Sequence, residues 1–302
     1  MHIDDYNVLE SIQESLGIGK VYTSKNEATF VVTAKEEVKI IIDILNKNSL
    51  NSTKYFNFLS FKKAFELYTN TGNYSTDDLN KQIELIKSNM NSKRFDFKLP
   101  EYHKIRITNY WLLGFVEGDG SFTLIRNNKY KLRFDISQSS KDLLLMVEIK
   151  NYFNHLAIKL HNSESYKENL FINKSSEGLP FNMSYLTIKN QLYIVNVLIP
   201  LFDSMVWLTK KELDYKDWKV VLKFRDLGLH YTKDGLKVIG QIFNQMNNNR
   251  LTSNKILSED EKVLLQKDIN RLLAEPSNLE VKDGNKVWIK SLNINQIQKK
   301  LG

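Results

Sequence analysis

The most informative segment for the fold is YWLLGFVEGDGSF, residues Tyr110–Phe122. Its apolar run predicts a buried helix that ends at Gly120, a natural helix stop. Gly114 and Gly118 lie four residues apart and therefore share one face of this helix. Because each glycine costs about 1 kcal/mol relative to alanine in a helix, we expect this face to admit a second helix at backbone distance.

The acid at the end of this helix indicates metal chemistry. Asp119 lies at the predicted helix C-terminus, where the helix dipole favours a cation. A hard divalent metal bound by the Asp119 carboxylate and the backbone carbonyl of Gly118 fits that position. The alternative from composition alone is a buried helix with an acidic C-terminal cap.

The residues after the helix alternate from Phe122 to Ile136 in the manner of a half-buried β-hairpin. The apolar positions are expected to face the helices: Phe122, Leu124, Leu132, Phe134 and Ile136. The polar positions are expected to face away and to bind nucleic acid: Thr123, Asn127, Lys129, Lys131, Arg133 and Asp135. A face of this mixed charge is suited to contacting phosphates and base edges, although an ordinary solvated sheet face has the same pattern.

The composition is that of a folded, basic protein. The 302 residues carry 43 Lys and Arg against 35 Asp and Glu, and the net charge of +8 favours a polyanionic partner. A hydrophobic content of 42% excludes global disorder. The absence of cysteine excludes a disulfide framework, thiolate metal sites and cysteine-based catalysis.

No segment of the sequence predicts membrane insertion or targeting. The longest apolar stretches, Val38–Leu45 and Tyr193–Phe202, are too short or too interrupted to span a bilayer. The N-terminal residues Met1–Asp5 lack a basic region and are too acidic for a transit peptide. Heavy use of Asn, Lys and Ile, which have AT-rich codons, indicates an AT-biased genome. We therefore expect a protein of the cytosol, or one made inside the compartment where it works.

The order helix, hairpin, helix, helix occurs twice, which predicts an internal repeat. The first copy comprises Asp4–Leu16, Lys20–Thr33, Glu36–Asn46 and Thr53–Tyr68, and the second comprises Lys141–Phe153, Ile158–Ile172 with Pro180–Ile188, Gln191–Phe202 and Lys210–Phe224. The similarity between the two copies is clearest between Ser52–Phe58 and Thr209–Tyr215. Aligning Asp5 with Asp142 leaves Tyr110–Gln138 without a counterpart in the first copy. Two copies favour a pseudo-dimer whose first half has lost a helix and two strands.

The repeat divides the chain into four expected parts. These are a truncated first half at residues 1–70, a linker at 71–108, a complete second half at 109–226, and a helical annex with a tail at 227–302. The linker has a helical patch at Leu79–Met90, and the annex has predicted helices at Thr232–Met246 and Ser258–Leu273 before an extended tail from Pro276 to Ser291. Helices mixed with antiparallel hairpins place the chain in the α+β class.

The segment Leu112–Gly120, LLGFVEGDG, resembles the signature of the LAGLIDADG homing endonucleases and group I intron maturases. Ser121-Phe122, the lead-in Ile105–Thr108 and the segment Asn247–Arg250 also resemble this family. The resemblance implies a pseudo-dimer of two αββαββα-type halves whose antiparallel β saddle lies on DNA, here with the N-terminal half truncated. It also implies two signature helices at the centre, each giving one acid to a shared metal cluster.

The resemblance implies a function and a set of residue roles. The function is that of an intron-encoded, site-specific endonuclease that hydrolyses double-stranded DNA at the intron insertion site with Mg²⁺ or Mn²⁺. Asp119 matches the metal-binding catalytic acid, and Glu117 matches an acid near the helix interface that Gly114 and Gly118 form.

Three further catalytic residues follow from the same resemblance. Gln138 matches a polar residue that orders water in the active site. Lys211 matches the basic residue near the cleaved phosphate, and Lys54 matches the same role in the first copy. Without the family resemblance, both lysines could equally be solvated surface charges, and Gln138 would be a polar residue at a strand end.

The sequence departs from the family in showing one signature helix where a pseudo-dimer needs two. Three explanations remain open. The chain is a fragment of a longer product, or its helix pairs with a second copy in a homodimer, or it has lost nuclease activity and binds group I intron RNA as a splicing maturase. The family implies a mitochondrial, organelle-encoded protein in each case.

Overall fold

The fold was examined in a computed structural model that describes residues 1–70, 72, 75–161, 170–174, 183–254, 257–282 and 286–297. Within these residues no helix is both long enough and apolar enough to cross a bilayer. The expected strand residues at 162–169 and 180–182 lie outside the described part of the chain.

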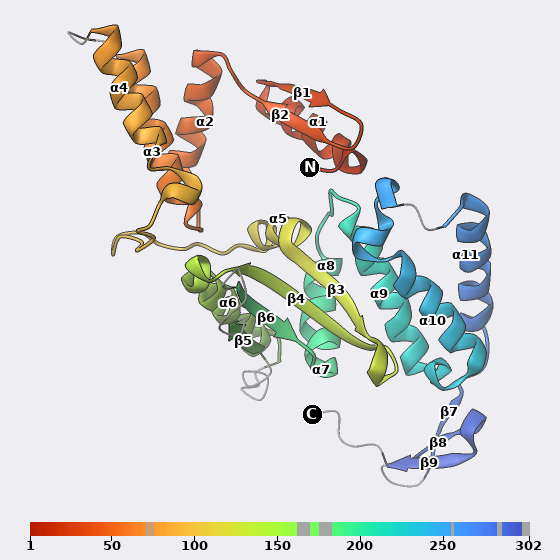
Figure 1. The fold of residues 1–302 in the computed structure, drawn as a ribbon. Helices are drawn as coiled ribbons and strands as arrows, with labels where there is room; N and C mark the ends of the chain where they lie inside the picture. Colours follow the sequence, from red (N-terminus) through yellow and green to blue (C-terminus); the bar gives the residue numbers. More distant parts are fainter. Residues whose placement is uncertain are drawn as a thin grey trace.

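The main body is a four-stranded antiparallel sheet with helices on one face (Figure 1). Its strands run in the order β3-β4-β6-β5, with bounds β3 Gly120–Ile125, β4 Lys131–Ser139, β5 Leu170–Lys174 and β6 Met183–Ile188. The helices of this body are α5 Asn109–Asp119, α6 Leu143–His161, α7 Gln191–Tyr193 continued by a π-helical stretch Ile194–Leu198 into α8 Ile199–Asp203, and α9 Lys211–Asp226. The α+β class expected from the sequence is confirmed.

Alternation along β3 and β4 sorts the side chains as the sequence predicts. Phe122, Leu132, Phe134 and Ile136 are fully buried, and Leu124 nearly so, beneath α6 and α9. The intervening residues of both strands are half-buried on the opposite face. The signature helix α5 begins at Thr108, whose hydroxyl accepts the backbone N–H of Trp111, as an N-cap does.

Two segments differ from the sequence-based prediction. Helix α6 continues to His161, so the strand expected from Ile158 is wrong at its start. The helix continues because Phe153 and Ala157 lie one turn apart and both remain in the core. The tail expected to be merely extended forms a three-stranded antiparallel sheet of β7 Leu279–Val281, β8 Lys286–Ile289 and β9 Ile294–Ile297. The buried Asn278 anchors this sheet by donating to the carbonyl of Gly228.

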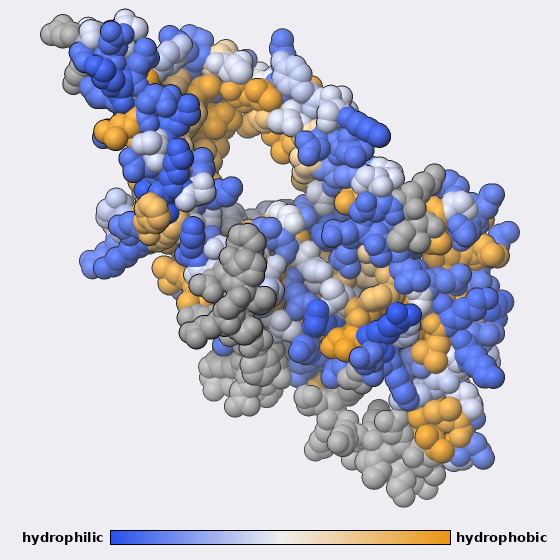
Figure 2. Space-filling model, viewed as in Figure 1, coloured by the Kyte–Doolittle hydropathy of each residue, from blue (hydrophilic) through white to orange (hydrophobic). Residues whose placement is uncertain are grey.

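The N-terminal elements form a smaller, thinly packed unit beyond α5 (Figure 1). They are α1 Tyr6–Leu16, the hairpin of β1 Lys20–Thr23 and β2 Ala28–Val31, α2 Lys35–Lys47, α3 Lys54–Thr69 and α4 Thr76–Lys87. In residues 1–70 the buried apolar side chains are Val8, Ile18, Ala28, Ile42 and Phe58, whereas Tyr22, Ile40 and Phe61 are each more than 40% exposed. Figure 2 shows a hollow between these elements and the main body, lined by hydrophobic residues on the N-terminal side.

Helix α10 packs on α9 and α11 packs on α10, so the two C-terminal helices cover the other side of the body (Figure 1). Helix α10 spans Lys233–Gln245 and α11 spans Glu259–Leu273, with a capping box between Ser258 and Glu261. Between them, the 3₁₀ turn Asn247–Arg250 folds back onto α9. Arg250 ion-pairs there with Asp214 at 2.7 Å and also with Asp217. The annex is thus joined to α9 by a largely buried charge cluster.

Candidate active site

Asp119 lies where α5 ends and β3 begins. The following residue must be glycine, because a Cβ at Gly120 would lie 2.7 Å from the carbonyl oxygen of Val116. The Asp119 side chain is exposed to solvent, and its Oδ2 accepts a 2.7 Å hydrogen bond from Nε2 of Gln138, near the end of β4. The structure therefore brings together the first two residues that the sequence assigned to catalysis.

The two lysines assigned to catalysis also lie near this carboxylate. Burial raises the pKa of Asp119 above its ordinary value, while the Gln138 hydrogen bond and the charges of Lys54 and Lys211 act in the opposite direction. Lys54 is the first residue of α3 and Lys211 the first residue of α9. One lysine comes from each repeat, and both direct positive charge at the same acid.

This arrangement fits half of a divalent metal site. Oδ1 of Asp119 receives no hydrogen bond from the described residues and is free to serve as a hard oxygen ligand. The backbone carbonyl of Gly118 belongs to the last turn of the same helix. In the described residues, no three His, Cys, Asp or Glu side chains gather as a metal cluster. A Mg²⁺ ion requires few protein ligands when substrate phosphates and water supply the rest.

Glu117 holds the turn that leads into α9. Its Oε1 accepts the backbone N–H groups of Leu208 at 2.7 Å and Thr209 at 2.8 Å, and the Thr209 hydroxyl at 3.2 Å. The signature helix therefore fixes the approach to Lys211 through its earlier acid.

No described residue packs on the glycine face of α5. A Cβ built on Gly114 or on Gly118 meets no atom within 4 Å, and both residues are exposed. The cost of two helical glycines is therefore not offset by packing among the described residues. This face is open to a second helix.

Three of the residues assigned to nucleic-acid binding form a network on the open face of the sheet. Asp135 accepts the Arg133 Nε–H at 2.6 Å and the hydroxyls of Thr123 at 3.2 Å and Thr187 at 2.8 Å. Lys131 is half-buried at the start of β4. The Arg133 guanidinium is thus oriented by its neighbours rather than free on the surface.

Asn127 and Lys129 do not lie on this face, so the expected alternation is wrong at the turn. Residues Arg126–Asn128 form a 3₁₀ turn, and Lys129 and Tyr130 adopt positive φ. The Lys129 ammonium lies 4.2 Å from the centre of the Tyr231 ring. Asn127 and Lys129 are both exposed at the tip of the hairpin, where the turn breaks the two-residue period of the strands.

Two carboxylates, Asp5 and Asp142, bind the residues that immediately precede the two candidate lysines, although they are distant from them in the sequence. Asp142 accepts the backbone N–H of Thr53, immediately before Lys54, and Asp5 accepts that of Lys210, immediately before Lys211. The signal that identifies them is the repeat itself, which sets Asp5 opposite Asp142.

Comparison with known proteins finds a matching family model and relatives that are similar over most of this chain. The family model described as LAGLIDADG endonuclease matches residues 1–65 and 112–222. Over 274 residues the chain is 25% identical to an uncharacterised mitochondrial protein, RF1, of Saccharomyces cerevisiae, covering 86% of this chain and 56% of that protein. Over 228 residues it is 27% identical to a probable intron-encoded endonuclease, Cox1-I1b, of Schizosaccharomyces pombe, covering 72% of this chain and 54% of that protein. The chain thus spans about half the length of these curated relatives.

Solved structures agree with this comparison. The homing endonuclease I-GzeII in complex with its DNA target superposes with a TM-score of 0.68 at 26% identity, covering 83% of this chain and 87% of that one. I-SmaMI bound to uncleaved DNA in the presence of calcium ions superposes with a TM-score of 0.63 at 27% identity, covering 82% and 86%.

Proposed function

Because this chain belongs to the LAGLIDADG endonuclease family, we propose that it acts as a site-specific endonuclease on double-stranded DNA at an intron insertion site. The observation that carries the proposal is the convergence of Asp119 and Gln138 from the second half with Lys54 and Lys211 from both halves. A carboxylate for a hard metal, a side-chain amide and two cations suit hydrolysis of a phosphodiester.

Each residue has a distinct task in this proposal. Asp119 offers its free Oδ1 and the helix C-terminus to a Mg²⁺ or Mn²⁺ ion, which when bound polarises the phosphate and readies water. Gln138 orients the carboxylate through Oδ2. Lys54 and Lys211 each neutralise charge on one scissile phosphate, one lysine for each DNA strand. The half-buried Arg133 and Lys131 contact the DNA backbone from the open face of the sheet, and Asn127 and Lys129 do so from the hairpin tip.

The second metal-binding acid comes from another signature helix. Two surfaces could bury a further helix and hairpin. One is the open helix face at Gly114 and Gly118, and the other is the apolar lining of the hollow in Figure 2. We infer that residues 1–70 are a partial half and residues 109–226 a whole one, joined by the linker 71–108 and followed by the annex 227–302. The missing helix is supplied by a longer product of the same gene or by a second copy in a homodimer.

A Gly114→Ala variant tests the open helix face. In the chain alone we expect the free energy of unfolding to rise by about 1 kcal/mol, because the methyl group meets nothing and alanine favours the helix. DNA cleavage is expected to fall at least tenfold, because the same methyl group would separate two paired helices by more than the interface allows. Chemical denaturation and a cleavage assay measure the two effects.

The control for this variant is Gly240→Ala in α10, another helical glycine, which lies away from α5. It is expected to leave cleavage unchanged. Equal loss of cleavage in both variants, or no loss in Gly114→Ala, would show that the α5 face does not pair.

The direct test of the proposed function is cleavage of a plasmid that carries the sequence of the uninterrupted insertion site. With Mg²⁺ or Mn²⁺ we expect linear product from that plasmid and none from a plasmid with a scrambled site. If a second copy supplies the helix, the rate at low protein concentration rises with the square of the concentration. An intact plasmid, from protein that is folded by circular dichroism and at concentrations that saturate DNA binding, contradicts nuclease function.

Splicing of a group I intron is the second candidate function. The observation that favours it is that the described residues hold one signature helix and one acid of the metal pair. Binding of intron RNA without DNA cleavage requires neither the second signature helix nor the second acid. Tight binding of the host intron RNA over a scrambled RNA, together with splicing that survives Asp119→Asn, would support this candidate over the nuclease.

We also infer that the protein is encoded and works in mitochondria. The support is the similarity to a yeast mitochondrial protein and to intron-encoded endonucleases, together with heavy use of Asn, Lys and Ile, residues that have AT-rich codons.

A further inference from the structure

The two helices that carry the catalytic lysines begin in the same unusual way. The residue before each helix, Thr53 before α3 and Lys210 before α9, already has helical dihedral angles, with φ −59° and ψ −9° at Thr53 and φ −61° and ψ −9° at Lys210. Neither uses its own side chain as a cap. In each case the lysine's backbone N–H points at a hydroxyl two residues earlier, Ser52 for Lys54 and Thr209 for Lys211.

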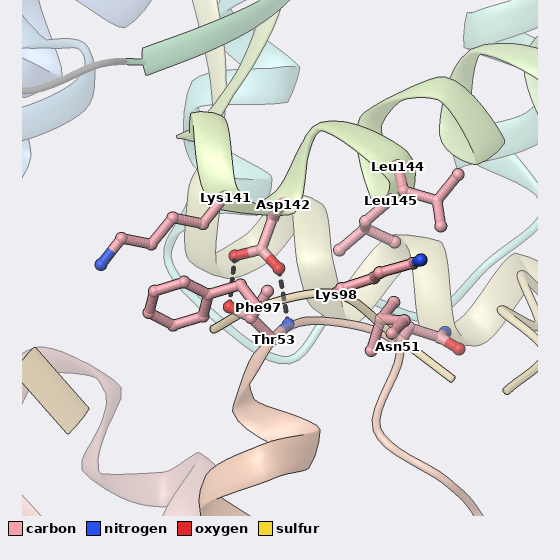
Figure 3. A pocket seen from close by; sticks show the side chains of 9 residues that line it. Asn51, Thr53, Phe97, Lys98, Lys141, Asp142, Leu144 and Leu145 are labelled. Atoms are coloured by element: carbon pink, nitrogen blue, oxygen red, sulfur yellow. Dashed lines mark hydrogen bonds between the residues drawn. The ribbon is translucent and has the colours of Figure 1, made fainter. Parts of the chain in front are cut away.

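The backbone N–H of each of these residues is bound by a carboxylate from the other half of the repeat. Asp142 Oδ1 accepts from Thr53 N at 2.6 Å, and Asp142 Oδ2 accepts from the Thr53 hydroxyl at 3.2 Å (Figure 3). Asp5 Oδ1 accepts from Lys210 N at 2.7 Å. Asp142 is 9% exposed, and its neighbours in the 330 Å³ cavity of Figure 3 include Thr53 and Lys141.

These contacts are reciprocal. Asp5 precedes α1 in the first half and binds the start of α9 in the second, while Asp142 precedes α6 in the second half and binds the start of α3 in the first. The repeat alignment pairs Asp5 with Asp142 and Thr53 with Lys210. The crossing therefore has the form of an isologous interface, in which residue i of one copy contacts residue j of the other and the reverse.

We propose that Asp5 and Asp142 are positioning residues, each of which reaches across the two halves to set the lysine of the other half over the metal-binding acid. An ionised carboxylate at a helix N-terminus is favoured both by the free N–H groups and by the helix dipole. Because the lysine is the next residue in each case, fixing the N–H of Thr53 or Lys210 fixes the direction of the side chain that follows. The inference rests on the proposed nuclease function for its consequence in catalysis, but not for its structural basis.

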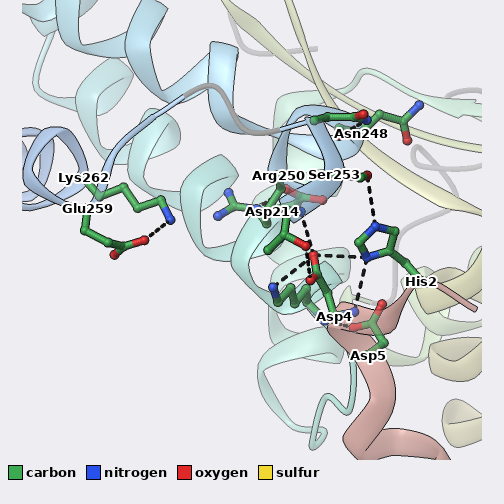
Figure 4. A network of polar contacts seen from close by, with 12 residues as sticks. His2, Asp4, Asp5, Asp214, Asn248, Arg250, Ser253, Glu259 and Lys262 are labelled. Atoms are coloured by element: carbon green, nitrogen blue, oxygen red, sulfur yellow. Dashed lines mark hydrogen bonds and ion pairs between the residues drawn. The ribbon is translucent and has the colours of Figure 1, made fainter. Parts of the chain in front are cut away.

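The Asp5–Lys210 and Asp142–Thr53 contacts differ in how many neighbouring polar contacts support them. On the Asp5 side, Asp4 ion-pairs with the Lys210 ammonium at 3.1 Å and accepts the Thr252 backbone N–H at 2.9 Å, and His2 contacts Ser253 at 3.0 Å (Figure 4). Asp142 itself has two hydrogen bonds, both to Thr53, and among the described residues no ion pair like that of Asp4 supports it; the added contact on this side is the pairing of Asn51 with the backbone of Arg106. Substitution of Asp142 is therefore expected to have the larger effect.

The first test follows the backbone amides by hydrogen exchange in the protein without DNA. In Asp142→Ala we expect exchange at Thr53 and Lys54 to accelerate about tenfold or more, with Lys210 and Lys211 unchanged, because a charge-assisted hydrogen bond is lost at one place. Asp5→Ala is expected to give the opposite pattern. Asp142→Asn, which keeps an oxygen acceptor, should restore most of the protection. The exposed Asp43 on α2 provides a matched control as Asp43→Ala.

The second test measures nicking of each DNA strand separately. Because each lysine serves one scissile phosphate, Asp142→Ala is expected to slow cleavage of one strand about tenfold or more, and Asp5→Ala to slow the other, with little change in DNA affinity. Asp142→Asn should recover most of the lost rate. A general loss of stability slows both strands together, so it does not produce this crossed pattern.

The two tests separate the inference from the function on which it rests. If the protein cuts no DNA, the exchange pattern still decides whether the carboxylates cross-anchor the two helices. If the protein cuts DNA but Asp5→Ala and Asp142→Ala slow both strands equally, or leave the exchange of Thr53 and Lys210 at the level of Asp43→Ala, the positioning role is wrong while the nuclease stands.

Discussion

Replacing Asp119 with asparagine is expected to abolish DNA cleavage, by about a thousandfold or more, while leaving the protein folded. The loss is of the size seen when a group that stabilises charge in a transition state is removed, because a neutral amide is a poor ligand for Mg²⁺. The fold should persist because the side chain is exposed and its hydrogen bond from Gln138 can be accepted by the asparagine oxygen. Plasmid cleavage and DNA binding in Ca²⁺ measure the two properties.

The stability of this variant has a predicted sign. Although the Asp119 side chain is exposed at the end of α5, partial desolvation raises the pKa of its carboxyl above the ordinary value, so the folded protein holds the ionised carboxylate less readily than the unfolded chain does. Asp119→Asn should therefore be at least as stable as the parent at neutral pH. The difference should shrink as the pH falls through the pKa of Asp119, because the parent then becomes neutral as well. Asp43→Asn serves as the control, and cleavage retained in Asp119→Asn would contradict its role as the metal ligand.

Replacing Arg250 with leucine is expected to lower the free energy of unfolding by about 3–5 kcal/mol, the cost of breaking a buried ion pair by removing one partner. The guanidinium is 15% exposed and ion-pairs with Asp214, whose side chain is 4% exposed (Figure 4). It also ion-pairs with Asp217. Asp214 also accepts the backbone N–H of Asn247. The variant leaves two carboxylates without their cation, and the annex loses the ion pairs that join it to α9.

The pH dependence and a surface control make this prediction specific. Burial already raises the pKa of Asp217 despite Arg250, so the loss in Arg250→Leu should be largest at neutral pH and shrink as the pH falls and Asp217 protonates. Arg271 pairs with Asp268 and Glu275 but is 51% exposed, so Arg271→Leu should cost less than about 1 kcal/mol. Urea denaturation at several pH values compares the variants. Equal losses in both would mean that the Arg250 cluster adds no more than a surface pair.

Much of the fold follows from local patterns in the sequence. Alternation fixed which residues of β3 and β4 enter the core, because successive side chains of a strand point to opposite faces. The glycines and the acid of Tyr110–Phe122 gave the position of α5 and of its end at Asp119. The repeat showed that helices beginning near Lys54 and Lys211 are equivalent, and both begin where expected.

Local patterns failed where a long-range contact decided the conformation. The 3₁₀ turn that moves Asn127 and Lys129 off the sheet is supported by Arg225 of α9. The Arg225 guanidinium donates a 2.6 Å hydrogen bond to the backbone carbonyl of Lys129. The tail becomes a sheet because Asn278 is fixed by Gly228 and Ser291. Neither pairing leaves a periodic signal, since the partners are distant in sequence.

Local patterns were sufficient to predict the signature helix, the position of Asp119 and the repeat that sets Asp5 opposite Asp142, and the signature motif predicted the family. The three-dimensional fold was needed to show that the lysines of both halves lie near Asp119, that Asp5 and Asp142 bind the residues before those lysines across the two halves, and that no described residue packs on the glycine face of α5. The reason is physical. Periodicity and helix stops depend on neighbours within a few residues, whereas the partner of a carboxylate depends on which backbone N–H groups folding brings within 3 Å of it.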